Sequence, residues 1–174
     1  MIVGTIIVFA LIPVVALVAN AVEDSNREIS FDSVYGESGL PVVTLSNDGK
    51  IFNFLVDTGA NLSLINASHL NDLKHEKIAG EGTLFGMEGN VQRVEFVTAI
   101  LSHNKDNFNV EFQVTNLDNA FNMIEKKHGI LIHGVLGTEF LEANKGKIDF
   151  IKHKLKYGKV ASKEDKATLE GQSK

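Results

Sequence analysis

The residues best suited to chemistry are Asp57, Thr58 and Gly59, which interrupt an apolar stretch between residues 54–56 and 62–65. Aspartate is depleted in strands and rarely buried without a partner, so a carboxylate directly after a strand needs an explanation. A strand could hold Asp57 rigidly as a general base, with a supporting hydroxyl from Thr58 and close backbone approach at Gly59. The alternative is an ordinary hairpin turn, because Asp, Gly and Asn are also turn formers.

The segments around this triplet favour the catalytic alternative. Residues 40–45 and 51–56 are predicted to form a β-hairpin whose turn contains Asp48-Gly49. A glycine-rich hairpin is predicted over residues 80–91. The apolar-apolar-glycine motif Val135-Leu136-Gly137 follows later, with an acidic residue and Phe-Leu just after it. Both of these motifs lie downstream of the triplet. An ordinary turn at Asp57 would not explain why they accompany it.

This ordered set resembles the retropepsin-like aspartic proteases, the single-domain enzymes of retroviruses and their bacterial relatives. The resemblance covers residues 40–157 and implies a mostly β, single-domain acid protease barrel with one or two short helices. It also implies an aspartic endopeptidase that needs neither cofactor nor metal. A short helix is expected over residues 118–127 and a strand over residues 130–132, before the glycine motif.

The same resemblance assigns roles to individual residues. Asp57 would be the catalytic acid and base, and Thr58 would form hydrogen bonds across a dimer. The backbone of Gly59 and Ala60 would contact the substrate. The tip of a flap that closes over the peptide would consist of Gly86, Met87, Glu88 and Gly89. The motif packed beneath the catalytic loop would be Val135, Leu136 and Gly137.

The chain contains one Asp-Thr-Gly and no second Asp-Thr-Gly or Asp-Ser-Gly. The known metal-free mechanism uses two carboxylates that share one proton, because like charges about 3 Å apart do not both ionise readily. A two-fold axis would supply the second carboxylate from an identical Asp57. The protease hypothesis therefore requires a homodimer that binds a peptide or protein substrate.

Composition excludes several other classes of protein. The 174-residue chain is 44% hydrophobic, which suffices for one domain with a core. A net charge of -5 without a basic stripe argues against nucleic-acid binding. The absence of cysteine excludes disulfides and thiolate chemistry. The six histidines show no metal-binding spacing, and His133 is predicted to be structural or a lining residue.

The N-terminal segment predicts contact with a membrane. Residues 2–19 carry no charged side chain and would span about 27 Å as a helix, close to the thickness of a bilayer core. An uncleaved single-pass anchor is favoured over a signal peptide cleaved near Ala21. The acidic flank after it favours an extracytoplasmic location for the domain. If the leader were cleaved near Ala21, the domain would be secreted instead. The predicted organisation is a leader (1–22), a polar tether (23–39), the protease domain (40–157) and a disordered tail (158–174).

Two further functions remain open from the sequence. The same fold could serve as a non-catalytic peptide-binding module, which would favour a monomer without cleavage activity. The soluble part could also be a membrane-anchored assembly protein that only makes contacts. Loss of Asp57 would then have no effect.

Overall fold

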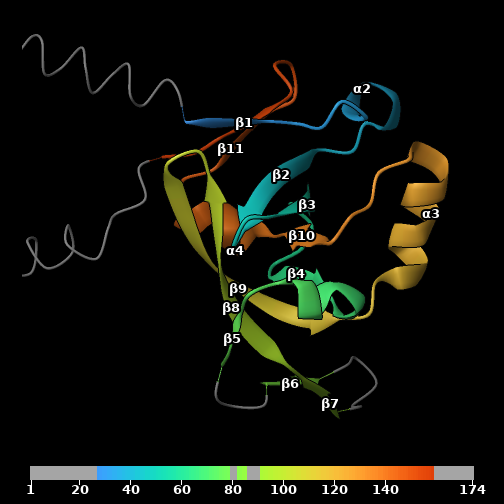
Figure 1. The fold of residues 1–174 in the computed structure, drawn as a ribbon, viewed down its shortest axis with the longest axis vertical. Coiled ribbons are helices and arrows are strands. Elements are labelled where there is room, and N and C mark those ends of the chain that lie inside the picture. Colours follow the sequence, from blue (N-terminus) through green and yellow to red (C-terminus); the bar gives the residue numbers. More distant parts are fainter. Residues whose placement is uncertain (1–26, 79–81, 86–90, 159–174) are drawn as a thin grey trace, which may run out of the picture.

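The computed structural model describes residues 27–78, 82–85 and 91–158. Its centre is a ring of six strands that closes because β8 pairs with β2 at Ser46 and Ser102 (Figure 1). In spatial order the ring contains β2 (Val42–Asn47), β3 (Lys50–Val56), β10 (Gly134–Leu136), β4 (Ser63–Asn66), β9 (Asp106–Thr115) and β8 (Phe96–His103). The short strand β5 (Glu76–Lys77) pairs with β8 outside this ring. The mostly β barrel expected from the sequence is thus present.

Alternation of apolar and polar residues explains why these segments form barrel strands. Along β9, the buried residues Phe108, Val110 and Phe112 alternate with exposed ones, so one face of the strand lines the core. The rings of Phe54 and Phe112 stack across the interior with their centroids 5.6 Å apart. The abundant phenylalanines of the sequence therefore fill the barrel.

Strand β10 lies between β3, to which it is parallel, and β4, to which it is antiparallel. The position of Gly134 is crowded, because a Cβ there would lie 2.3 Å from the Leu64 carbonyl oxygen. The strand predicted over residues 130–132 is wrong, since the pairing begins only at Gly134. Ile130 and Ile132 are instead buried in a second apolar cluster.

Helices cover the barrel from outside and are more numerous than the one or two expected. Phe121 of α3 packs into the second cluster against Ile130 and Ile132, so this helix covers one side of β10 and β3 (Figure 1). The helices of the described residues are α2 (Tyr35–Ser38), the 3-10 helix η1 (Ala67–Asp72), α3 (Asp118–His128) and α4 (Thr138–Ala143).

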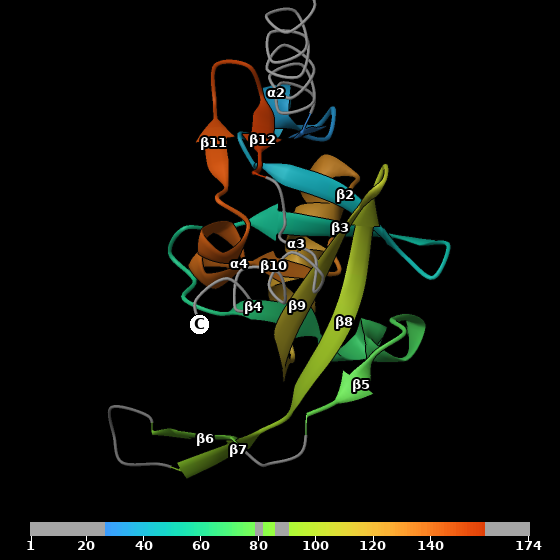
Figure 2. The same ribbon diagram turned by 90° about the vertical axis from the view of Figure 1, so that its left-hand side faces the viewer.

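Two smaller sheets lie at opposite ends of the molecule (Figures 1 and 2). One consists of β1 (Glu28–Ser30), β12 (Lys154–Lys156) and β11 (Lys147–Asp149), and the other of β6 (Gly82–Phe85) and β7 (Val91–Val94). Part of the predicted polar tether is therefore folded, because β1 joins a sheet and Ile29 is buried in the main core. The rest of the predicted tether, residues 23–26, lies outside the described residues.

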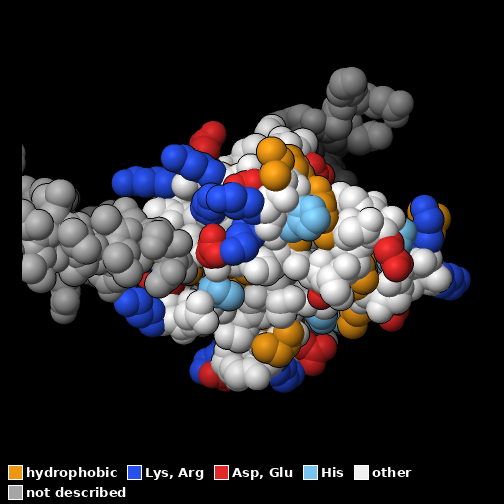
Figure 3. Space-filling model, turned by 90° about the horizontal axis from the view of Figure 1, so that it is seen from above, with side chains coloured by type: hydrophobic (Ala, Val, Ile, Leu, Met, Phe, Trp, Pro, Cys, Tyr) orange, Lys and Arg blue, Asp and Glu red, His pale blue; other side chains and the backbone are white. Residues whose placement is uncertain are grey.

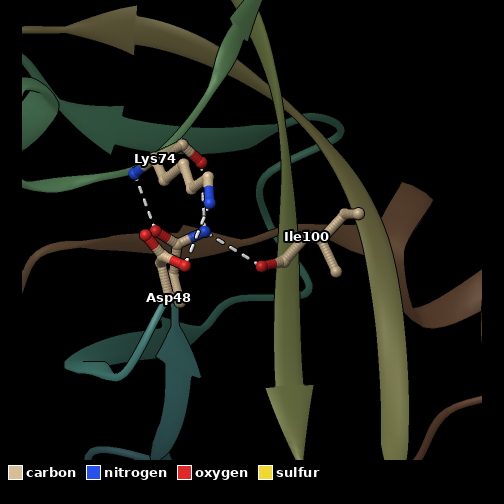
Figure 4. Close-up of polar contacts among 4 residues, drawn as sticks. Asp48, Lys74 and Ile100 are labelled. Carbon is tan, nitrogen blue, oxygen red and sulfur yellow. Dashed lines mark hydrogen bonds and ion pairs between the residues drawn. The ribbon is translucent and has the colours of Figure 1, made fainter.

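A buried amide fixes the turn between β2 and β3 (Figure 4). The Asn47 side chain donates to the carbonyl oxygens of Lys74 (3.1 Å) and Ile100 (2.9 Å), and accepts from the Lys74 N–H (2.7 Å). Asn47 is 3% exposed, so these bonds satisfy a polar group that would be costly to bury alone. This end of β3 is thereby tied to β8 and to the segment before β5.

No helix within the described residues is long and apolar enough to cross a membrane. The predicted leader (1–22) and most of the predicted tail (158–174) lie outside the described residues.

Candidate active site

Strand β3 delivers Asp57 to the end of the barrel where β10 also ends. The Asp57 N–H donates to the Leu136 carbonyl oxygen (3.0 Å), and the Val56 N–H donates to the Pro41 carbonyl oxygen (2.9 Å). The backbone on both sides of this position is thus paired with neighbouring segments. The Asp57 side chain is exposed, so the barrel presents a rigidly held carboxylate to solvent.

Two hydrogen bonds from backbone N–H groups to Asp57, one to its side chain and one to its carbonyl oxygen, close the loop after this residue. The Gly59 N–H donates to Asp57 Oδ1 (2.8 Å), and the Ala60 N–H donates to the Asp57 carbonyl oxygen (3.2 Å). The first bond orients the carboxylate and occupies only part of its capacity, because two carboxylate oxygens offer about four acceptor sites. The remaining acceptor sites can receive a water molecule or a second carboxyl group.

The glycine motif and the start of α4 form a floor beneath this loop (Figure 2). Backbone N–H groups of α4 donate into the loop, from Thr138 to the Ala60 carbonyl oxygen (2.9 Å) and from Glu139 to the Asn61 carbonyl oxygen (3.2 Å). The Gly137 N–H donates to the buried Ser63 hydroxyl (3.2 Å). These bonds join the two ends of the loop, residues 57–63, to residues 136–139.

Gly137 allows this close approach. A Cβ at this position would lie 2.6 Å from the Leu62 carbonyl oxygen and 2.7 Å from the Ala60 carbonyl oxygen. Both atoms belong to the backbone, so no side-chain rotation could relieve the clash. Any larger residue would push the floor and the catalytic loop apart.

The structure brings some of the predicted site residues together and does not describe others. Asp57, Thr58, Gly59 and Ala60 form one loop, and residues 135–137 lie directly below or beside it. Thr58 and Gly59 are exposed, whereas Ala60 is half-buried. The predicted flap tip, Gly86, Met87, Glu88 and Gly89, lies outside the described residues. The strands that flank it, β6 and β7, pair with each other in register.

Glu139 is a part of the floor to which the sequence assigned no role. Its pKa is raised, first because the carboxyl group is partly buried and then because the negative charge of Glu111 lies nearby. A hydrogen bond from the Ser63 backbone opposes this shift of the Glu139 pKa. The acidic residue beside the glycine motif was visible in the sequence, but its neighbour on β9 was not.

His133, next to the glycine motif, has a structural role. Its Nδ1 accepts a hydrogen bond from the Asn53 N–H (3.0 Å), and its ring lies 4.8 Å from that of His69. Burial, followed by the charge of His69, lowers the pKa of His133. The ring thus helps to join β3 to the chain before β10, in agreement with the structural role predicted for it.

Comparisons with known proteins place this geometry in context. A family model described as retroviral aspartyl protease matches residues 38–149, more than half of the chain. Among solved structures, EIAV protease complexed with the inhibitor HBY-793 is 19% identical, with 62% of this chain and 90% of that chain covered and a TM-score of 0.43. A retropepsin-like aspartic protease from Rickettsia conorii is also 19% identical, with coverages of 74% and 84% and a TM-score of 0.44. No curated protein sequence matches the chain significantly.

Proposed function

Because the chain belongs to the retroviral aspartyl protease family and is an aspartic endopeptidase, we propose that it acts as a homodimer with two Asp57 carboxylates. One carboxylate accepts a proton from the attacking water while the other donates a proton to the carbonyl oxygen of the scissile peptide bond. The two Asp57 side chains share a single proton between them, because both cannot ionise readily at a separation of about 3 Å.

The observation that carries this proposal is the exposed, oriented carboxylate of Asp57. The protomer fixes its backbone through Leu136 and one carboxylate oxygen through Gly59, yet leaves the side chain open to solvent. The sequence contains no second Asp-Thr-Gly. A partner protomer related by a two-fold axis supplies the matching group at the same height and orientation.

The remaining loop residues support the dyad and the substrate. Thr58, exposed beside Asp57, bonds across the dimer axis and stiffens both loops. The backbone of Gly59 and Ala60 binds the extended peptide, and the hairpin that contains β6 and β7 covers it from the opposite side.

Two features of the described residues support a dimer surface at the Asp57 loop. Strand β1 pairs with β12 over three residues within one protomer, and β12 pairs in turn with β11. Association therefore does not require exchange of these strands between protomers. We place the two-fold axis at the exposed loop of residues 57–62, where Leu62 also shows an accessible apolar side chain, 38% exposed.

The test combines cleavage of a peptide library with sedimentation of the full chain in mild detergent. Asp57→Asn is expected to abolish cleavage, and Asp48→Asn, a carboxylate at the other end of β3, is expected to retain it. A statine-type inhibitor should shift the intact protein from monomer to dimer. Cleavage by Asp57→Asn, or full activity in a strictly monomeric sample, would refute the proposal. Binding without cleavage by the intact protein would indicate the peptide-binding module instead.

We also propose that residues 2–19 anchor the protein as a single membrane span with an extracytoplasmic protease domain. The support is the uncharged run of the sequence and its acidic flank, which offers little to retain the domain in the cytoplasm. Extraction with carbonate tests this directly. Release of the full-length chain into the soluble fraction would contradict the anchor, and a shortened chain beginning near Ala21 would indicate a cleaved signal.

A further inference from the structure

The turn between β11 and β12 exposes two large apolar side chains. Ile151 is 92% exposed and its neighbour Phe150 is 53% exposed, whereas four phenylalanines of the barrel are no more than 1% exposed, namely Phe52, Phe54, Phe108 and Phe112. A single exposed apolar residue is ordinary on a protein surface, whereas an adjacent aliphatic and aromatic pair at the tip of a hairpin is more informative. The hairpin tip, residues 150–153, is defined here by these two residues with Lys152 and His153.

The hairpin tip is surrounded by positive charge. Residues 145–156 contain five lysines and one acidic residue, Asp149. Lys154 pairs with Glu28, and Lys156 pairs with Asp149 at 3.2 Å, while Lys147 and Lys152 are exposed. Seen from this end of the molecule, hydrophobic and histidine side chains lie beside Lys/Arg side chains, with acidic side chains among them (Figure 3). Apolar tips with basic flanks are the combination that binds the interface of anionic bilayers.

The domain holds the hairpin tip in a defined conformation. The Phe31 N–H donates to the His153 carbonyl oxygen (2.9 Å), and the Lys152 N–H donates to Asp149 Oδ1 (2.9 Å). The Phe150 ring lies 6.3 Å from the Phe31 ring. Because these contacts already order the turn, insertion of its apolar side chains would cost little additional conformational entropy.

The chain that follows the apolar leader joins this hairpin at its base, where the Tyr157 N–H donates to the Arg27 carbonyl oxygen (3.0 Å). Strand β1 begins at Glu28 and pairs antiparallel with β12, and Phe31 contacts His153. Only residues 20–26 separate the uncharged run from Arg27, and seven extended residues reach at most about 25 Å. A leader inserted in a bilayer would therefore keep the hairpin tip close to the membrane surface.

We infer that the β11–β12 hairpin tip docks on the lipid bilayer, with Phe150 and Ile151 in the interfacial region and the lysines on anionic headgroups. A second copy of the chain is a less favourable partner for the hairpin tip. A two-fold axis through this surface would place the positively charged lysines of the two copies opposite each other. The inference rests on the proposed membrane anchor. Docking would fix the orientation of the protease domain relative to the membrane.

The chain has no tryptophan, so one introduced indole reports on its own surroundings. We would reconstitute the full chain carrying Ile151→Trp in vesicles of phosphatidylcholine and phosphatidylglycerol. The matched control is Ile100→Trp, because Ile100 is also largely exposed (57%) but lies on β8. We expect a blue-shifted emission and strong quenching by brominated lipid for Ile151→Trp, and solvent-like emission without such quenching for Ile100→Trp. Lys152→Glu added to Ile151→Trp should weaken the quenching.

The outcomes separate the inference from the proposals on which it rests. Failure of the chain to float with the vesicles would overturn the anchor, and the docking inference with it. Flotation with solvent-like emission from the Ile151→Trp variant would overturn the docking inference and leave the anchor intact. A blue shift that appears in detergent as the protein concentration rises would assign the hairpin tip to a second copy, against docking on lipid. Proteolytic activity takes no part in these readouts, so the Asp57 mechanism is tested separately.

Discussion

Strand β3 lies between two turns that each carry an aspartate, and the two carboxylates have different partners. Asp48, before its first residue, pairs with Lys74 at 3.0 Å on the surface, next to the buried amide of Asn47. Asp57, after its last residue, is exposed and accepts a hydrogen bond from Gly59 in its own loop. At the first turn the protomer supplies the carboxylate with a cation. At the second it orients the carboxylate and leaves acceptor capacity for other molecules.

The difference arises from the groups that each turn meets across the barrel. At the Asn47 end, a side-chain amide connects three backbone groups from other segments (Figure 4). At the Asp57 end, the connections run from the backbone N–H groups of residues 137–139 into the loop, and the Asp57 side chain is not needed for them. The fold uses one carboxylate oxygen of Asp57, through Gly59, and leaves the rest of its acceptor capacity available for chemistry.

The largest expected effect is a loss of activity when Asp57, but not Asp48, is replaced. Asp57→Asn should lower kcat/KM by about 10³-fold or more, because general acid–base catalysis alone contributes about 10²–10⁴-fold. Its free energy of unfolding should change by less than about 0.5 kcal/mol, since the side chain is exposed. Peptide cleavage and denaturant unfolding of the same samples provide the measurements. Asp48→Asn should keep full activity, and equal losses in the two variants would erase the distinction.

The next effect concerns the floor of the catalytic loop. Gly137→Ala should destabilise the domain by about 2–3 kcal/mol, because the added Cβ meets backbone carbonyl oxygens that cannot rotate away. Gly36→Ala is the matched control, since a Cβ there would meet nothing within 4 Å. Urea unfolding compares the two variants. If Gly137→Ala is as stable as the wild type and fully active, the tight packing between floor and loop has no importance for either property.

Local sequence chemistry was sufficient to predict the hairpin of β2 and β3 and the loop at its end. The alternation of Phe52 and Phe54 with polar or outward residues fixes which face is buried, and Asp48-Gly49 marks the turn. The helix expected over residues 118–127 is also present, as α3, because Phe121 and Ile124 recur at helical spacing.

Features that depend on distant partners could not be predicted in this way. The strand expected over residues 130–132 is found at 134–136, where Gly134 lies closely against the Leu64 carbonyl oxygen and the Phe54 ring. Asn47 looks like any turn asparagine in the sequence, and its partners lie 27 and 53 residues away. The same holds for Glu139 of α4, whose pKa is raised by burial and then by the negative charge of Glu111 on β9.

A third prediction examines the Asn47 turn. Asn47→Ala should destabilise the domain by about 2 kcal/mol, because the partly buried backbone groups of Lys74 and Ile100 lose their partner. Activity per folded molecule should stay unchanged, since this turn lies at the end of β3 opposite Asp57. Thermal unfolding and active-site titration give the two quantities. Asp48→Asn, which breaks only the exposed pair with Lys74, should cost no more than about 1 kcal/mol.

The smallest effect is a dependence of stability on pH that comes from Glu139, beneath the loop after β3. Glu139 beneath the loop has a raised pKa, through partial burial and the charge of Glu111, whereas the amide of Asn47 does not titrate. The folded state therefore binds the Glu139 proton more tightly than the unfolded state does. This contribution to stability is fully present below the ordinary carboxyl pKa of about 4.3 and is lost as the pH rises through the higher value of the folded protein.

Glu139→Gln should remove that contribution. Relative to this variant, the wild type should lose stability as the pH rises from about 4 towards 7. Glu142→Gln, an exposed change on the same helix, should leave the wild-type dependence intact. Glu111→Gln should weaken it, because one of the two causes of the raised pKa is then absent. Parallel curves of unfolding free energy against pH for the wild type and Glu139→Gln would show that the floor does not titrate.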